Sequence, residues 1–242
     1  MKRTSWIIAA VSLLTIGVLA VVILRGRREP VCEGKRPSIW LRELEKEVQV
    51  DGRLSQTTQV AKAIQRIGAN ACPSLLAMLR SKDSPLKRRL VSLVHRQSFL
   101  RFDIITSDRL RARAHYAFVV LGPLTEPEVP SVVACLSDEN PRARSSAANI
   151  LSFIDSNGLR CVPGLIRALQ DPDHEVRSSA AIALRQIDIH TKSSEFEASG
   201  SIPESRLKAA VPALKSLLND RDLSVQTAAA LALQQIGPLG SE

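Results

Sequence analysis

One pattern recurs along the second half of this 242-residue chain and limits what the chain can fold into. Apolar residues stand 13, 17, 21 and 24 positions after a proline in three successive copies. Steps of four, four and three place those residues on one face of a helix. Each copy also carries an aspartate eight residues after its proline, and the pairs are Pro130 and Asp138, Pro163 and Asp171, and Pro212 and Asp220.

Each copy predicts two helices joined by a tight turn. Proline suits the start of the first helix because it has no amide hydrogen to satisfy there, and apolar pairs such as Leu165 and Leu169 form that helix's buried face. Asp, Asn and Ser in the turn are residues that cap a following helix. Neither helix can cover its own apolar face, so neighbouring copies must stack into an α-solenoid. Only 3% of the residues are aromatic, which favours closely packed helices over a sheet.

Weaker copies extend the array toward the N-terminus. The copy at Pro73 continues with an apolar stripe from Leu86 to Val94, where we expect its second helix. Two further second helices end before Gly68 and Gly122. The sequence therefore predicts six second helices in one phase.

Two gaps between the prolines exceed the regular spacing of 33 residues. The first gap is 24 residues longer, and we assign the excess to a helix over 108–121 and an irregular insert near 97–106. The second gap is 16 residues longer and holds a serine-rich insert near 188–205. Inserts in a solenoid emerge on one face, where they either contribute to binding or form plain surface loops.

The repeat resembles the HEAT-repeat family, including its short HEAT-like variants. The residues that carry the resemblance read V-P-x-L-I-x-x-L-x-D-x-x-x-x-V-R-x-x-A-A-x-x-L-x-x-I from Val162 to Ile187, and a copy runs from Val211 to Gly237. The resemblance implies an all-α fold, a right-handed α-solenoid of helix pairs over residues 38–242, with a role in protein interaction. It implies no particular reaction, because the motif describes packing and the fold hosts many activities.

An uncharged stretch of 21 residues, Thr4–Leu24, precedes the repeats. A helix of this length spans a hydrocarbon core of about 30 Å, and no cleavage site typical of a secretory signal follows it. We therefore expect a single-pass transmembrane anchor over residues 1–25 and a linker over residues 26–37. The arrangement is similar to small membrane-tethered HEAT proteins of bacteria. Two basic residues before the span and five after it lean toward a cytoplasmic C-terminal domain, and they leave the side open.

The sequence shows no set of residues typical of a metal, cofactor or catalytic site. Its four cysteines include no CxxC pair, and Cys72 and Cys135 occupy apolar positions of the repeat. His174-Glu175 resembles the His-Glu pairs of HEAT-type di-iron hydroxylases, but the matching turns of the other copies contain no histidine. One such pair cannot hold two irons. We therefore expect no metal, no cofactor and no enzyme activity.

Basic residues concentrate in one part of the array. Residues 80–113 contain ten basic and three acidic side chains, whereas residues 138–242 carry a net charge of −2. Duplex nucleic acid requires a basic stripe over several repeats, so this distribution favours an acidic protein partner or anionic lipid over nucleic acid. The expected contact residues are Lys87, Arg88, Arg89, Arg109 and Arg113.

The sequence as a whole predicts a non-enzymatic, membrane-tethered scaffold for protein–protein interaction, held in the bilayer by residues 4–24. The alternative is a lyase on a HEAT frame, or a nucleic-acid-binding protein that uses the basic cluster at residues 80–113. A pocket with a convergent cluster of titratable residues would favour the enzyme, and a groove without one would favour the scaffold.

Overall fold

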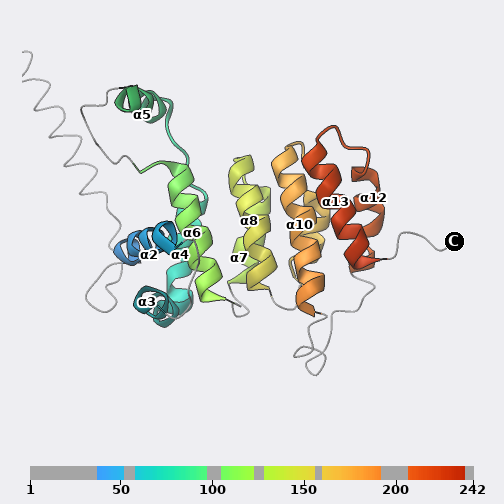
Figure 1. Cartoon of the computed structure of the whole chain (residues 1–242), viewed down its shortest axis with the longest axis horizontal. Helices are drawn as coiled ribbons and strands as arrows, with labels where there is room; N and C mark the ends of the chain where they lie inside the picture. Colours follow the sequence, from blue (N-terminus) through green and yellow to red (C-terminus); the bar gives the residue numbers. More distant parts are fainter. Residues whose placement is uncertain are drawn as a thin grey trace, which may run out of the picture. The chain divides into compact units, whose positions relative to one another are not determined.

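A computed structural model of the chain describes residues 37–51, 58–96, 105–122, 128–155, 160–191 and 207–237 (Figure 1). The chain divides into two units, Met1–Pro37 and Ser38–Glu242. The predicted anchor and most of its linker lie outside the described residues, as do residues 97–104 and 192–206 of the two predicted inserts. Among the described helices, none combines the length and the apolar character that crossing a bilayer requires.

All regular structure in the described residues is helical. The helices that begin the pairs are α4 (Cys72–Leu79), α7 (Val129–Val133), α9 (Val162–Ala168) and α12 (Val211–Leu217), and α2 (Pro37–Asp51) precedes them. The second helices are α3 (Gln59–Ile67), α6 (Ser107–Leu121), α8 (Pro141–Ile154), α10 (His174–Thr191) and α13 (Leu223–Ile236). Two 3-10 segments, η1 (Gly68–Ala71) and η2 (Ala134–Ser137), adjoin α4 and α7, and a further helix, α5 (Pro85–Arg96), lies between α4 and α6.

The second helices stack in chain order. Helix α3 contacts α6, α6 contacts α8, α8 contacts α10, and α10 contacts α13, so that the last four run side by side in Figure 1. Their apolar stripes form the core: Val176, Ala180 and Leu184 of α10 are fully buried. Burial of one such leucine stabilises the fold by about 1.5–3 kcal/mol relative to exposure. The all-α arrangement of stacked helix pairs predicted from the repeat is confirmed for the described residues.

The second helix of the Pro73 unit is α6, and the assignment of that role to the stripe beginning at Leu86 was wrong. Helix α4 packs against α6, while Leu86 on α5 is 78% exposed. The two segments carry apolar stripes in the same phase, because Leu110 follows Leu86 by the 24 residues of the excess. Helix α6 brings Phe118, which is fully buried, into the core. The inserted helix is therefore α5, and residues 108–121 belong to the regular array.

Helix α6 has explicit start and stop signals. The Thr106 hydroxyl accepts a hydrogen bond from the backbone N–H of Arg109 at 3.3 Å. Gly122 follows the last turn with a φ of 69°, and its N–H donates to the carbonyl of Phe118 at 3.0 Å. This positive φ strains residues that carry a Cβ. These two hydrogen bonds fix where α6 begins and ends, and so which of its residues face α8.

Candidate interaction groove on the second helices

An arginine that recurs at one position of the repeat ties the second helices α8 and α10 each to the next unit. Arg177 of α10 donates through Nε and Nη2 to the two carboxylate oxygens of Asp220, at 2.8 Å each. Its Nη1 donates to the carbonyls of Asp171 and Pro172, at 2.8 and 3.0 Å, in the turn of its own unit. One guanidinium thus closes its own turn and binds the following one.

Arg144 makes the same contacts one unit earlier. It binds both oxygens of Asp171, at 2.8 and 2.7 Å, and donates to the carbonyls of Asp138 and Glu139 at 2.8 and 3.3 Å. Hydrogen bonds to a charged donor are about twice as strong as neutral ones. The two arginines therefore fix the relative placement of α8, α10 and α13.

The contacts differ in the first unit of the series, and the residue itself differs in the last. In the Pro73 unit the equivalent arginine is Arg111 of α6, whose Nη1 donates to the carbonyl of Ser81 at 2.7 Å. In the last unit the position holds Gln226, which donates to the carbonyl of Asp220 at 2.6 Å. Glutamine closes its own turn but is too short to bind a further one. The arginine contacts among the described residues therefore end at α13.

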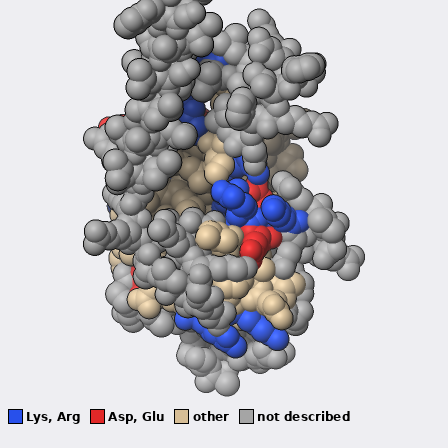
Figure 2. All heavy atoms as spheres, turned by 90° about the vertical axis from the view of Figure 1, so that its left-hand side faces the viewer, with Lys and Arg blue, Asp and Glu red and all other residues tan. Residues whose placement is uncertain are grey.

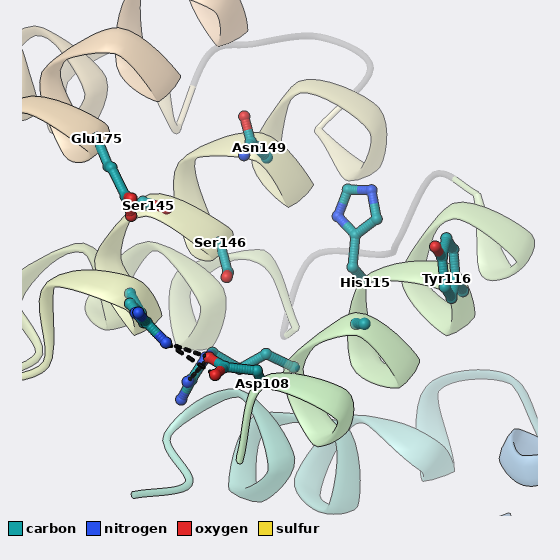
Figure 3. Close-up of a pocket in the computed structure, with 10 residues that line it drawn as sticks. Asp108, His115, Tyr116, Ser145, Ser146, Asn149 and Glu175 are labelled. Atoms are coloured by element: carbon teal, nitrogen blue, oxygen red, sulfur yellow. Dashed lines mark hydrogen bonds and ion pairs between the residues drawn. The ribbon is translucent and has the colours of Figure 1, made fainter. Parts of the chain in front are cut away.

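A hollow of about 430 Å³ lies along α6 and α8 and reaches the start of α10 (Figure 3). Figure 3 shows side chains from all three helices around it. Its lining is polar and consists of Asp108, Arg111, Ala112, His115, Tyr116, Arg142, Ser145, Ser146, Asn149 and Glu175. We refer to this surface as the groove.

At the N-terminal end of α6, two guanidiniums share one carboxylate. Arg142 Nη1 donates to both oxygens of Asp108, at 2.6 and 2.8 Å, and Arg111 Nη2 donates to Oδ1 at 2.5 Å. Burial opposes ionisation of Asp108, but hydrogen bonds from the two arginines outweigh it and lower the pKa of that carboxyl. This end of the groove is a closed ion-pair cluster.

The other end of the groove is aromatic. His115 stands edge-on to the ring of Phe153, with centroids 6.2 Å apart and planes at 82°, and its ring centroid is 6.0 Å from that of Tyr116. Burial lowers the pKa of His115, so the imidazole is neutral at physiological pH. This part of the groove offers ring surface and uncharged polar atoms.

Three of the five predicted contact residues are engaged within the chain. Lys87 pairs with Asp83 at 2.6 Å, while Arg109 and Arg113 pair with Glu45 of α2 at 2.9 and 2.6 Å.

The pairs with Glu45 have a structural role. Burial opposes ionisation of Glu45, but hydrogen bonds from Arg109 and Arg113 lower the pKa of its carboxyl. The side chain of Arg113 is 4% exposed. The two arginines therefore join α2 to α6, and Arg113 leaves little surface for a partner.

Arg88 and Arg89 of α5 are exposed, and no ion pair joins either to another described residue. The five predicted contact residues thus do not form one patch. On the face drawn in Figure 2, basic side chains gather beside acidic ones. The predicted continuous basic surface is divided between internal ion pairs and the exposed arginines of α5.

The described residues show no arrangement typical of a reaction centre. No group of three or more His, Cys, Asp or Glu among them could hold a metal ion. His174 and Glu175 are exposed, and His174 lies 3.8 Å from Asp222. Burial raises the pKa of the Cys72 thiol to about 11, and burial together with Asp155 raises that of Cys161. Neither thiol is an activated nucleophile.

The sequence contained a signal for the groove that its repeat pattern alone did not expose. Arg144 and Arg177 sit one residue after the first apolar position of the stripe, and each faces an aspartate one unit later. These repeated Arg and Asp positions mark the edge of the helix that adjoins the turns. The groove includes this edge at Arg111 of α6, and its other lining residues stand at positions whose residues differ between units.

Residues 129–198 match the family of HEAT repeats. This segment contains the pairs α7–α8 and α9–α10, so the predicted resemblance is confirmed for these two units. No curated protein matches the chain. HEAT repeats generally mediate protein binding, and the matched units contribute two of the three helices that line the groove.

Proposed function

We propose that this chain is a non-enzymatic scaffold that binds an extended segment of a partner protein in the groove, and that residues 4–24 tether it to a membrane. The membrane tether rests on the uncharged length of that stretch, which lies outside the described residues. The scaffold role rests on the matched HEAT repeats and on the surface that their second helices expose.

One observation carries the scaffold proposal: the groove combines unpaired hydroxyls with paired charges. No hydrogen bond joins the side chains of Ser146 or Tyr116 to another described residue, so both can serve a ligand. Asn149 adds an amide beside them. Uncharged donors and acceptors of this kind match peptide groups, whereas a phosphate backbone would require free guanidiniums.

The absence of a base–nucleophile pair in the groove supports binding over catalysis. Among the described residues, none is hydrogen-bonded to His115, the one imidazole in the groove lining. A general base must lie within about 2.6–3.2 Å of the group that it activates. The groove therefore favours the scaffold over the lyase alternative.

A photo-crosslinking amino acid at residue 146, inside the groove, tests the binding site in cells. We expect the chain with this residue to form a covalent adduct with a protein partner, identified by mass spectrometry. The matched control places the same amino acid at Lys215, which is exposed on α12 away from the groove. Equal adducts from both positions would reject the groove as the site.

The energetic test uses that identified partner in a binding assay. Tyr116→Ala and Asn149→Ala together should weaken binding by about tenfold or more, as expected when a central aromatic contact is truncated. Because both guanidiniums of the groove already bind Asp108, affinity should change less than about threefold when salt is raised, unlike binding to a basic patch. A steep salt dependence would point instead to the exposed arginines.

Protease protection tests the tether and its side. The full chain is placed in sealed membrane vesicles of known orientation and read with an antibody to the C-terminus. We propose a cytoplasmic repeat array, which predicts cleavage only when the cytoplasmic face is exposed. Recovery of the chain in the wash after alkaline extraction would reject the tether.

A further inference from the structure

Helix α5 lies outside the stack of second helices. It is absent from the helix pairs that pack together in the described core, and its Leu86 is 78% exposed, the highest value among the large hydrophobic side chains described. Arg88 and Arg89 are exposed as well. A 24-residue insertion that carries a helix with an exposed leucine and two exposed arginines calls for a function of its own.

The helical register separates the residues of α5 into two faces. At 100° per residue, the apolar positions fall within an arc of about 160° that also includes Lys87, and these positions are Leu86, Leu90, Val91, Leu93 and Val94. The positions on the other side are Arg88, Arg89, Ser92, His95 and Arg96. A short helix with one apolar face and one strongly basic face is typical of helices that lie in a membrane interface.

Lys87 of α5 is paired with a carboxylate, and this contact fixes one end of the helix. Asp83 accepts hydrogen bonds from Lys87 Nζ at 2.6 Å, from the N–H of Ser107 at 2.9 Å and from the Ser107 hydroxyl at 3.0 Å. Burial opposes ionisation of Asp83, but these hydrogen bonds lower the pKa of its carboxyl. The carboxylate thus joins the first turn of α5 to the start of α6 and removes the one charge near the apolar face.

We propose that α5 binds the surface of an anionic bilayer, with the apolar face among the acyl chains and the arginines at the head groups. An acidic polypeptide would satisfy the arginines but would leave Leu86 in water. An anionic bilayer satisfies both faces, because it supplies hydrocarbon next to negative charge. The helix gives the array a second membrane contact, one that depends on lipid charge, and this contact is independent of partner binding in the groove.

An environment-sensitive fluorophore on α5 tests this contact in the full chain. A nitrobenzoxadiazole label is attached to Leu86→Cys in a Cys32→Ser background, since Cys72, Cys135 and Cys161 are buried. Vesicles contain phosphatidylcholine alone, or phosphatidylcholine with phosphatidylserine. We expect fluorescence to rise about threefold and shift to shorter wavelength on the anionic vesicles, with little change on the neutral ones.

Further variants test whether the response comes from the apolar face of α5 and whether it depends on the charge of the arginines. The same label at Ser92→Cys, an exposed position on the basic side of α5, should rise less than half as much. Arg88→Glu with Arg89→Glu should remove the response of the label at residue 86. The reversal of Lys62 and Lys215 to Glu, exposed on α3 and α12, makes an equal change in net charge and should preserve it.

The label reports α5 alone, so the result does not depend on insertion of residues 4–24 or on the groove. An unchanged signal on anionic vesicles would overturn the proposal, as would an equal rise on neutral vesicles. A rise with a soluble polyglutamate peptide, and none with vesicles, would overturn it in favour of an acidic protein partner.

Discussion

Replacement of Arg177 by methionine removes the contact between the last two repeat units while keeping the apolar stem of the side chain. The wild-type guanidinium makes two hydrogen bonds to Asp220 and two to backbone carbonyls, all between 2.8 and 3.0 Å. The side chains of Arg177 and Asp220 are only 16% and 9% exposed. The variant therefore removes the guanidinium from two carbonyls and from a carboxylate that keeps only backbone donors such as the N–H of Asp222 at 3.0 Å, in a place that water reaches poorly.

The size of the effect follows from these contacts. Hydrogen bonds that involve a charged group contribute about 1.5–3 kcal/mol net, and an unpaired partner adds to the cost. We expect Arg177→Met to lower the free energy of unfolding by about 2–3 kcal/mol. In a double-mutant cycle with Asp220→Asn, the coupling energy should be about 1.5–2 kcal/mol. The Lys82–Glu139 pair, with a 2.8 Å contact between side chains 53% and 91% exposed, should show no measurable coupling.

Unfolding in urea, followed by circular dichroism, measures these energies in the full chain in a mild nonionic detergent. Urea carries no charge and so leaves the ion pair unscreened. Hydrogen bonds from Arg177 lower the pKa of Asp220, so this pair stabilises the fold above the unfolded carboxyl pKa of about 3.9. The coupling should stay constant from about pH 7 to 5 and disappear as the pH falls through the lower folded value. A coupling no larger than that of the exposed control pair would refute this reasoning.

Three smaller predictions concern the backbone, the packing and the thiols. Gly122→Ala should lower the free energy of unfolding by about 1–2 kcal/mol, read from the urea midpoint, because residue 122 has a φ of 69°. A Cβ on Gly164 would lie 2.9 Å from Leu136 Cδ1, so Gly164→Val should cost about 1–3 kcal/mol in the same assay and Gly164→Ala less. Because burial raises the pKa of the thiols of Cys72 and Cys161, neither should react with iodoacetamide at neutral pH until the chain is unfolded, as mass spectrometry of the alkylated protein would show.

The groove itself was only partly predictable. The repeat pattern places Ser146 and Asn149 away from the buried face of a second helix, since neither belongs to the apolar stripe Ala143, Ala147, Leu151 and Ile154. The neighbouring helix was misassigned at that point, so Tyr116 was placed in an insert and not beside α8. A groove needs two adjacent helices. The apolar stripe of one helix does not show which other helix lies beside it.

Which arginines are exposed and which are buried in ion pairs could not be predicted from the sequence either. Local charge counts treated Arg88 and Arg113 alike, yet one is exposed and the other is buried against Glu45. Residues 45 and 113 are 68 positions apart, and only folding brings them together. Charge pairs depend on distance in space, which a count along the chain does not contain.

The sequence by itself determined the helices and their faces, because apolar periodicity, prolines at the first turn and glycines after the last turn act within one or two turns of the chain. The tertiary structure alone decided which of the two in-phase helices, α5 or α6, packs against α4. Both carry a stripe that could be buried, and the helix that packs against α4 is the one that buries Phe118 and Ala114 completely. Because α6 takes this place, α5 lies outside the stack, and its Leu86, Arg88 and Arg89 are exposed.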